Sequence, residues 1–320
     1  MTPLSFLLFF GIAILMLVLF LGATYLTARL LCDVTMNRRV PRFMRGRKEI
    51  LAKITGSDDF VNTLFEKEKL LAGEKTETVE IEGYGGVKLK GHLLTARDPK
   101  RIIIAVHGWR SSWSRDFGIV SDFFKTNSTV LYVEQRAQQG SEGDFITFGI
   151  CERYDILEWI KWTVGKFSSA LPIYLLGVSM GASTVLMSTG LGLDGAVHGI
   201  IADSGFTVPE DIWSHVVRHN LHLPYRLYKR QASAECKRRT GYTPIECSTL
   251  DALRDSTTPV LFVHGTDDSF VPVEMTYENY KACSSPKRLF VVPGANHGMS
   301  YFVDKSGYES EVERFFCQYD

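Results

Sequence analysis

Six short, almost continuously apolar runs recur beyond residue 100 of this 320-residue chain. Runs of this kind are typical of strands buried on both faces of a parallel sheet. Between them lie segments with apolar residues at helical spacing, at 151–167, 180–190, 273–282 and 307–318. This alternation predicts an α/β fold with a mostly parallel sheet and helices on both faces. The apolar runs are 101–107, 129–134, 172–178, 198–203, 259–265 and 287–294.

Two further features complete the predicted domain, which covers residues 76–320. Residues 76–82 and 87–96 alternate apolar and polar side chains around a glycine-rich turn, which favours a β-hairpin. Residues 206–257 are too long for one crossover helix, and they contain aromatic residues as well as Pro and Gly stop signals. We interpret this interval as a small helical cap over the end of the sheet.

The N-terminus predicts one transmembrane helix, because residues 1–28 contain no charged side chain and are long enough to cross a bilayer. Basic residues dominate the following flank, so the positive-inside rule places the remaining chain in the cytoplasm, with the protein single-pass in the cell membrane. A cleaved signal peptide is the alternative, although it would need a basic start and a shorter apolar run. The basic residues are Arg29, Arg38, Arg39, Arg42, Arg45, Arg47 and Lys48.

Residues 29–75 are expected to form a basic juxtamembrane linker and a short amphipathic helix at 58–71. The basic stretch 38–48 either lies along anionic headgroups or only sets the topology. Acidic and basic residues are equal in number, which gives no support for nucleic-acid binding. The six cysteines form no CxxC pair, and a reducing compartment fits them best.

Gly177-Val178-Ser179-Met180-Gly181 matches the pattern G-x-S-x-G between a predicted buried strand and a predicted helix. In that context the pattern predicts a sharp turn that exposes the Ser179 hydroxyl beside a helix N-terminus. Small residues on both sides of the serine allow the backbones to approach closely. The alternative is a structural glycine-rich turn without catalysis.

A serine nucleophile needs a base, and the base needs an acid that orients it. Of the eight histidines, only His297 lies in a loop just after the last predicted strand, whereas His107 and His264 end strands and suggest structural roles. Asp267 and Asp268 follow the strand at 259–265, and the order serine, aspartate, histidine is that of α/β-hydrolases.

A metal site is a remote alternative. Four potential ligands share one face of a predicted cap helix, but one straight helix cannot surround a tetrahedral ion, and the chain has no HExxH motif. These residues are Asp211, His215, His219 and His222.

Taken in order, four motifs make residues 76–318 resemble α/β-hydrolases of the serine aminopeptidase-like group, close to bacterial membrane-anchored hydrolases. The resemblance implies that Asp268 is the acid, with Asp267 and Asp203 as alternatives. It also implies that the backbone N–H of Trp109 joins that of Met180, the residue after the nucleophile, in an oxyanion hole. The motifs are His107-Gly108-Trp109, Gly177-x-Ser179-x-Gly181, His264-Gly265-Thr266-x-Asp268-x-x-Val271-Pro272 and Gly294-Ala295-Asn296-His297.

One segment departs from the pattern of that group. Where relatives tend to read D-x-R-x-H-G-x-S, this chain has Glu134, Gln138 and a glycine displaced by one position, within residues 134–141. The loop shapes the floor of the predicted site, so its form has to come from the structure.

These observations predict a membrane-tethered serine hydrolase with the triad Ser179, His297 and Asp268, acting through an acyl-enzyme without a metal or cofactor. The expected substrate is a small-molecule or lipid ester, because the anchor holds the site near the bilayer and the cap offers Phe206, Trp213 and Tyr225. A peptidase or amidase of the same fold and a non-catalytic binding protein are the alternatives. The sequence gives no oligomeric state.

Overall fold

The computed structural model describes residues 3–39, 47–167 and 171–320. Eight strands form one sheet in the order β1-β2-β4-β3-β5-β6-β7-β8. The hairpin β1–β2 is antiparallel and β2 pairs antiparallel with β4, whereas the remaining neighbours are parallel. The strands are β1 Glu77–Glu82, β2 Lys88–Leu94, β3 Arg101–Val106, β4 Ser128–Val133, β5 Ile173–Val178, β6 Val197–Asp203, β7 Val260–Gly265 and β8 Lys287–Val292.

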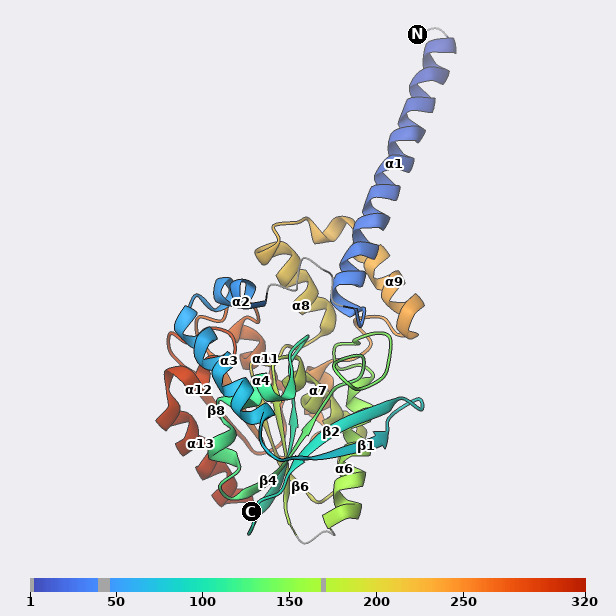
Figure 1. Ribbon diagram of the computed structural model, residues 1–320. Coiled ribbons are helices and arrows are strands. Elements are labelled where there is room, and N and C mark those ends of the chain that lie inside the picture. Colours follow the sequence, from blue (N-terminus) through green and yellow to red (C-terminus); the bar gives the residue numbers. More distant parts are fainter. Residues whose placement is uncertain (1–2, 40–46, 168–170) are drawn as a thin grey trace.

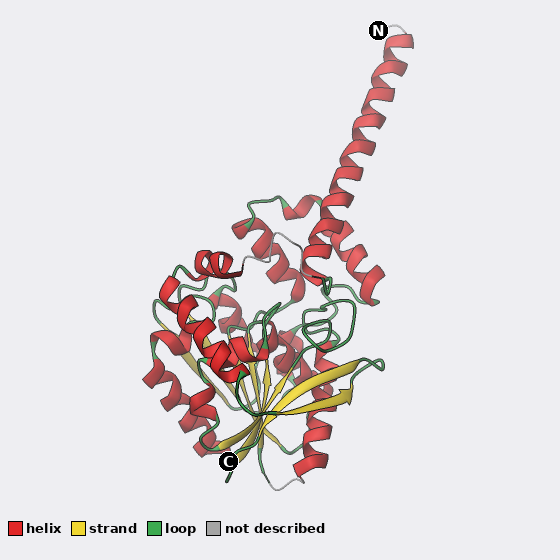
Figure 2. Ribbon diagram, viewed as in Figure 1, coloured by secondary structure: helices red, strands yellow, loops and turns green. Residues whose placement is uncertain are grey.

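Helices cover both faces of this sheet, as the sequence predicts (Figures 1 and 2). The described helices that pack around the sheet or its loops are α2 Arg47–Thr55, α3 Asp58–Ala72, α4 Trp113–Gly118, α5 Ser121–Phe124, α6 Glu152–Phe167, α7 Met180–Ser188, η3 Thr189–Leu191, α10 Thr249–Arg254, α11 Val273–Ala282, α12 Ser300–Val303 and α13 Lys305–Tyr319.

The central strand β3 shows why two helical layers are needed. Its side chains alternate between two hydrophobic clusters, with Ile102, Ile104 and Val106 on one face and Ile103 and Ala105 on the other. The first cluster includes residues of α6, α7 and α10, and the second includes residues of α4, α5 and α13. A strand buried on both faces therefore reads as an unbroken apolar run.

The cap lies between β6 and β7 and is smaller than residues 206–257. It consists of α8 Pro209–His215, a π-helical turn η4 Val216–Asn220, a 3₁₀ turn η5 Tyr225–Leu227 and α9 Lys229–Thr240. The following helix α10 instead contributes Leu253 to the main core beneath the sheet.

The N-terminal helix α1 Pro3–Met36 continues past residue 28 (Figure 1). Residues 4–23 are all exposed, whereas Thr24, Ala28, Cys32 and Met36 are buried along one face. Their spacing of four residues places them on a single stripe, and α9 packs against it. The segment that the sequence assigned to a linker thus begins as a packed helix, and most of its basic stretch lies outside the described residues.

Candidate active site

Ser179 lies in a strained turn between β5 and α7. Its φ of 56° is positive, a conformation that non-glycine residues adopt rarely. Both flanking glycines are required by close approach: a Cβ on Gly177 would lie 2.5 Å from the Gly181 carbonyl carbon, and one on Gly181 would lie 1.9 Å from the Val106 carbonyl oxygen. The turn aims the serine at the N-terminus of α7, where backbone N–H groups favour negative charge.

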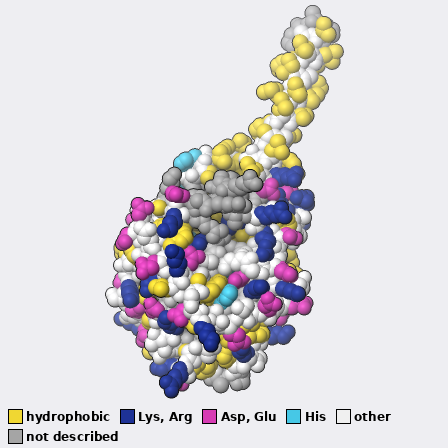
Figure 3. Space-filling model, in the orientation of Figure 1, with side chains coloured by type: hydrophobic (Ala, Val, Ile, Leu, Met, Phe, Trp, Pro, Cys, Tyr) yellow, Lys and Arg dark blue, Asp and Glu magenta, His cyan; other side chains and the backbone are white. Residues whose placement is uncertain are grey.

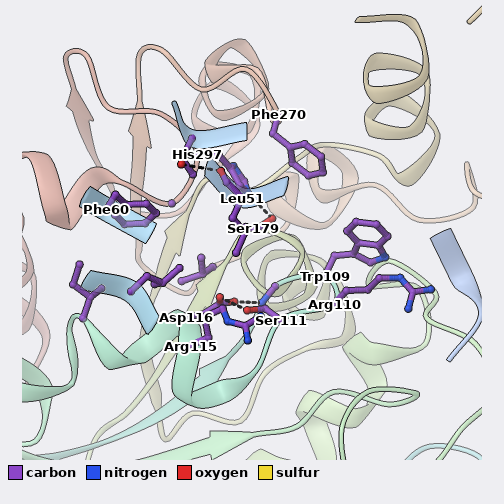
Figure 4. A pocket seen from close by; sticks show the side chains of 16 residues that line it. Leu51, Phe60, Trp109, Arg110, Ser111, Arg115, Asp116, Ser179, Phe270 and His297 are labelled. Carbon is purple, nitrogen blue, oxygen red and sulfur yellow. Dashed lines mark hydrogen bonds between the residues drawn. The ribbon is translucent and has the colours of Figure 1, made fainter. Parts of the chain in front are cut away.

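A chain of hydrogen bonds links Ser179 to two side chains from the loops after β7 and β8. His297 Nε2 lies 3.0 Å from Ser179 Oγ, and His297 Nδ1 lies 2.7 Å from Asp268 Oδ2. Figure 4 shows the His297 and Ser179 side chains pointing toward one another. The structure thus brings together the three residues predicted as the triad. Asp268 and His297 follow Ser179 by 89 and 118 positions in the sequence.

The other two candidate acids lie elsewhere. Asp203 ends β6, where its backbone carbonyl accepts from the Ser179 N–H at 2.8 Å and its carboxylate accepts from the Ser204 hydroxyl at 2.9 Å. Burial raises the pKa of Asp203 to about 6. Asp267 is exposed and accepts from the Thr266 hydroxyl. Of the three aspartates, only Asp268 is hydrogen-bonded to the imidazole of His297.

Asp268 is buried, yet it is held as a carboxylate. Burial alone would raise its pKa, but the charges and hydrogen bonds of His297 and His264 lower the pKa well below its usual range. Its other oxygen, Oδ1, accepts from the backbone N–H groups of Phe270 and Val271 at 2.9 and 2.8 Å. The carboxylate is therefore fixed from both sides.

His264, for which the sequence suggests a structural role, contacts the acid of the triad. Its Nε2 lies 3.0 Å from Asp268 Oδ2 and 2.9 Å from the Val271 carbonyl oxygen, and both partners are acceptors. Nε2 must therefore carry the proton, while Nδ1 accepts from the Thr276 hydroxyl at 2.6 Å. His264 thus orients the acid. Its place four residues before Asp268 was the available signal.

The pKa of the His297 imidazole is raised. Burial lowers its pKa, but the facing carboxylate of Asp268 outweighs burial, and the net effect is a pKa above the usual 6.5. His107, the other histidine that ends a strand, has a pKa lowered by burial. It accepts from the Gln135 N–H at 3.2 Å and donates to the Gly108 carbonyl, which agrees with its structural interpretation.

The loop after β3 and the start of α7 each place one backbone donor beside the nucleophile. A Cβ on Gly108 would lie 3.2 Å from the Ser179 Cβ, so this loop touches the serine. Among the described residues, no hydrogen bond occupies the backbone N–H of Trp109 or of Met180. Both predicted oxyanion donors therefore lie at the site with their N–H groups available.

Three groups hold the loop after β3 in shape; it comprises residues 107–112 and is here called the oxyanion loop. Asp116 accepts from the Gly108 N–H at 2.6 Å and from the Ser111 hydroxyl. Gln138 Oε1 accepts from the N–H of Arg110 at 2.7 Å. Gln138 is one of the positions at which the sequence departs from the related pattern, so the altered loop 134–141 buttresses the site rather than leaving it open.

The third group is the end of helix α1. The last carbonyls of a helix have no partner within it. Here Trp109 Nε1 donates to the Thr35 carbonyl at 2.8 Å, and the Arg110 guanidinium donates to the Val34 carbonyl at 2.8 Å and to the Asn37 carbonyl at 2.6 Å. No motif in the sequence predicts these contacts, which join residues more than 70 positions apart.

A cavity of about 190 Å³ opens beside Ser179 and His297 (Figure 4). The oxyanion loop and the side chain of Phe270, whose ring lies 5.2 Å from that of His297, form the end next to the serine. Helices α2 and α3 contribute apolar side chains to the lining. The apolar lining residues include Leu51, Phe60, Leu64, Ile119 and Val178.

The cap aromatics do not line this cavity. Phe206, Trp213 and Tyr225 are buried in a cluster with the packed stripe of α1. The expectation that the cap offers these aromatic side chains to a lipid ester substrate is therefore wrong, because they are buried in the packing of the cap against α1. Among the described residues, no group of three or more His, Cys, Asp or Glu side chains is arranged to hold a metal ion.

Comparisons with known proteins agree with this fold. The sequence is 28% identical over 242 residues to the uncharacterized protein YqkD of Bacillus subtilis (strain 168), covering 76% of this chain and 79% of that protein. The structure is similar to the esterase Pf2001 of Pyrococcus furiosus, with a TM-score of 0.64 and 24% identity over 78% of this chain and 93% of that one. It is also similar to the esterase RhEst1 of Rhodococcus sp. ECU1013, with a TM-score of 0.56 and 18% identity over 76% and 99% of the two chains.

The chain therefore has the α/β-hydrolase fold. No family model matches the sequence, so the resemblance to the serine aminopeptidase-like group stays a prediction.

Proposed function

We propose that this protein is a membrane-anchored serine hydrolase that cleaves acyl esters. The observation that carries the proposal is the hydrogen-bonded chain from Ser179 through His297 to Asp268, ending on a serine with positive φ at a helix N-terminus. Structural similarity to esterases supports ester hydrolysis on this fold. The relatives in sequence are uncharacterized and name no substrate.

In the proposed reaction, Ser179 Oγ attacks the ester carbonyl carbon while His297 Nε2 takes the hydroxyl proton. Asp268 keeps the imidazole in the required tautomer and stabilises the imidazolium. The carbonyl oxygen becomes an oxyanion, which accepts from the N–H groups of Met180 and Trp109. His297 then gives its proton to the leaving alkoxide, and the C–O bond breaks to leave an acyl-enzyme. Water, deprotonated by His297, hydrolyses that intermediate and restores Ser179.

The cavity supports an apolar acyl group as the part of the substrate that is recognised. Leu51, Phe60 and Leu64 line it with apolar side chains. The charged lining residues Arg115 and Asp116 are bonded within the protein, to Glu68 and to the loop after β3. Burying each methylene of an acyl chain there would favour binding by about 0.8 kcal/mol. We therefore expect esters of medium-length acyl chains to be better substrates than acetyl esters.

The apolar helix α1 supports anchoring. It is the one described helix that is long and apolar enough to cross a membrane, over Leu4–Met36. Its exposed part, residues 4–23, rises about 30 Å at about 1.5 Å per residue, the thickness of a bilayer core. The buried stripe beyond it and the bonds to Trp109 and Arg110 favour a retained helix over a cleaved signal peptide.

Labelling with a fluorophosphonate tests the chemistry. Purified full-length protein in detergent is expected to be labelled, and Ser179→Ala is expected to abolish labelling and to lower kcat on p-nitrophenyl esters by at least about 10⁴-fold. Ser183→Ala, a buried serine one helical turn further along α7, serves as the control and should be labelled normally. A wild-type protein that is neither labelled nor active on any ester would indicate a binding protein on this fold.

A further inference from the structure

We infer that residues 216–230 of the cap, here called the cap rim, form a second membrane contact that lies on anionic lipid headgroups beside helix α1. The inference rests on the proposed anchoring of α1 and is independent of the hydrolase chemistry. The rim comprises η4, η5, the residues that connect them, and the first two residues of α9.

The rim exposes apolar side chains that a water-facing surface does not need. Leu221, Leu223 and Leu227 are 50%, 40% and 49% exposed within seven residues of chain. Val217 and Tyr225, between and beside them, are buried in the cap and hold the segment in place. A fixed segment that presents three leucines outward is typical of an interfacial contact rather than of a loop.

The charge of the rim has one sign. No Asp or Glu occurs between residues 212 and 234, whereas the rim contains Arg218, Arg226, Lys229 and Arg230. Lys229 pairs with Glu210 of α8. Within the described part of the chain, no ion pair joins the three arginines to an acid. Leucines beside unpaired arginines match a bilayer interface with anionic headgroups, the chemistry of a cytoplasmic leaflet.

The position of the rim agrees with where the bilayer would end. Thr24 is the first buried residue after the exposed stretch 4–23 of α1, and its hydroxyl accepts from Gln231 Nε2 at 3.2 Å. Gln231 directly follows the rim. Figure 1 shows the turns between α8 and α9 beside α1 where it leaves the domain, and Figure 3 shows hydrophobic side chains gathered at this base. The rim is therefore continuous with the membrane-facing end of α1.

Depth-dependent quenching in full-length protein tests the inference. The exposed Cys317 is replaced by serine, and single cysteines are introduced as Leu221→Cys, Leu223→Cys or Leu227→Cys and labelled with an environment-sensitive fluorophore. The proteins are reconstituted in nanodiscs of phosphatidylcholine and phosphatidylglycerol that contain spin-labelled lipid. Val303→Cys, 45% exposed on α12, is the matched control, and Leu15→Cys reports whether α1 is inserted.

We expect blue-shifted emission and lipid quenching at the three rim positions and at residue 15, and neither at residue 303. Replacing Arg218, Arg226 and Arg230 by glutamine is expected to weaken rim quenching, by about fivefold in the contact equilibrium for each arginine.

Three results would overturn the inference. Quenching at residue 15 with rim signals equal to the control would leave α1 anchored and the rim in water. A blue shift without quenching would place protein, such as a second copy, on the rim. Absence of quenching at residue 15 would refute the proposed anchor itself, and the rim contact with it.

Discussion

At the scale of one residue, the contacts of Asp268 distinguish it from the two other aspartates that could orient His297. Its Oδ2 faces two imidazoles, while Asp203 faces the Ser204 hydroxyl and Asp267 faces solvent. We therefore predict that Asp268→Asn lowers kcat by about 10³- to 10⁴-fold, because the amide no longer selects the reactive tautomer of His297.

Asp203→Asn is the matched control. Its backbone bond to Ser179 would persist, and we expect kcat to fall less than about tenfold. Steady-state kinetics on a p-nitrophenyl ester decide the matter, since equal losses in the two variants would remove the assignment of Asp268 as the acid.

A second residue-scale prediction concerns pH. His297 acts as a base only when neutral, and Asp268 raises its pKa above 6.5. The activity kcat/KM should therefore be full above that raised pKa and fall as the pH drops through it. In Asp268→Asn the carboxylate is gone, so the remaining acidic limb should move to lower pH. The measurement uses a substrate without a titrating group, such as p-nitrophenyl butyrate, at constant ionic strength. An acidic limb that stays in place in Asp268→Asn would show that another group titrates.

At the scale of elements, helix α3 has two faces with different expected roles. Leu64 lines the cavity, whereas Leu70 on the same helix is 58% exposed. Leu64→Trp should occupy part of the cavity and lower kcat/KM for octanoyl relative to acetyl esters by about tenfold or more. Leu70→Trp should leave the ratio unchanged. A shared change in both variants would point to disturbed packing of α3 rather than to an acyl site.

Helix α1 is expected to act on the site as well as to anchor it. Its final carbonyls accept from Trp109 and Arg110, which hold the oxyanion loop. Replacing residues 4–23 by an unrelated apolar span should leave kcat unchanged in detergent. Deleting residues 1–39 should lower kcat by about tenfold or more, since several hydrogen bonds of roughly 1 kcal/mol each are lost. Full activity of the deletion variant would reduce α1 to a tether.

Helices α1 and α3 also show which parts of the structure the sequence could not predict. The strands, the hairpin and helices α6, α7 and α11 follow from local periodicity, and Ser179, Asp268 and His297 follow from motifs at the ends of those strands. The cavity wall formed by α2 and α3 and the burial of Trp213 in the cluster with α1 depend on contacts between distant segments. No local pattern encodes such contacts.

For the whole molecule, orientation is the property to be tested. We predict that the hydrolase domain lies in the cytoplasm, as the basic flank of α1 indicates. Cys317 is exposed on α13 and the other five cysteines are buried. A membrane-impermeant maleimide should therefore label expressing cells only after permeabilisation. An epitope added before Met1 should be accessible on intact cells. Labelling of Cys317 in intact cells would contradict the predicted topology and indicate the opposite orientation.

The packed lower half of α1 has a consequence for how such a protein would find its substrate. Because Ala28, Cys32 and Met36 are buried against the cap, a rigid helix rather than a flexible linker joins the membrane span to the catalytic domain. The height of Ser179 above the bilayer would then be nearly constant, and the search for substrate becomes lateral diffusion in two dimensions. Molecules presented at that height in the same membrane would be within reach, whereas those carried deep in the cytosol would have to come to the surface.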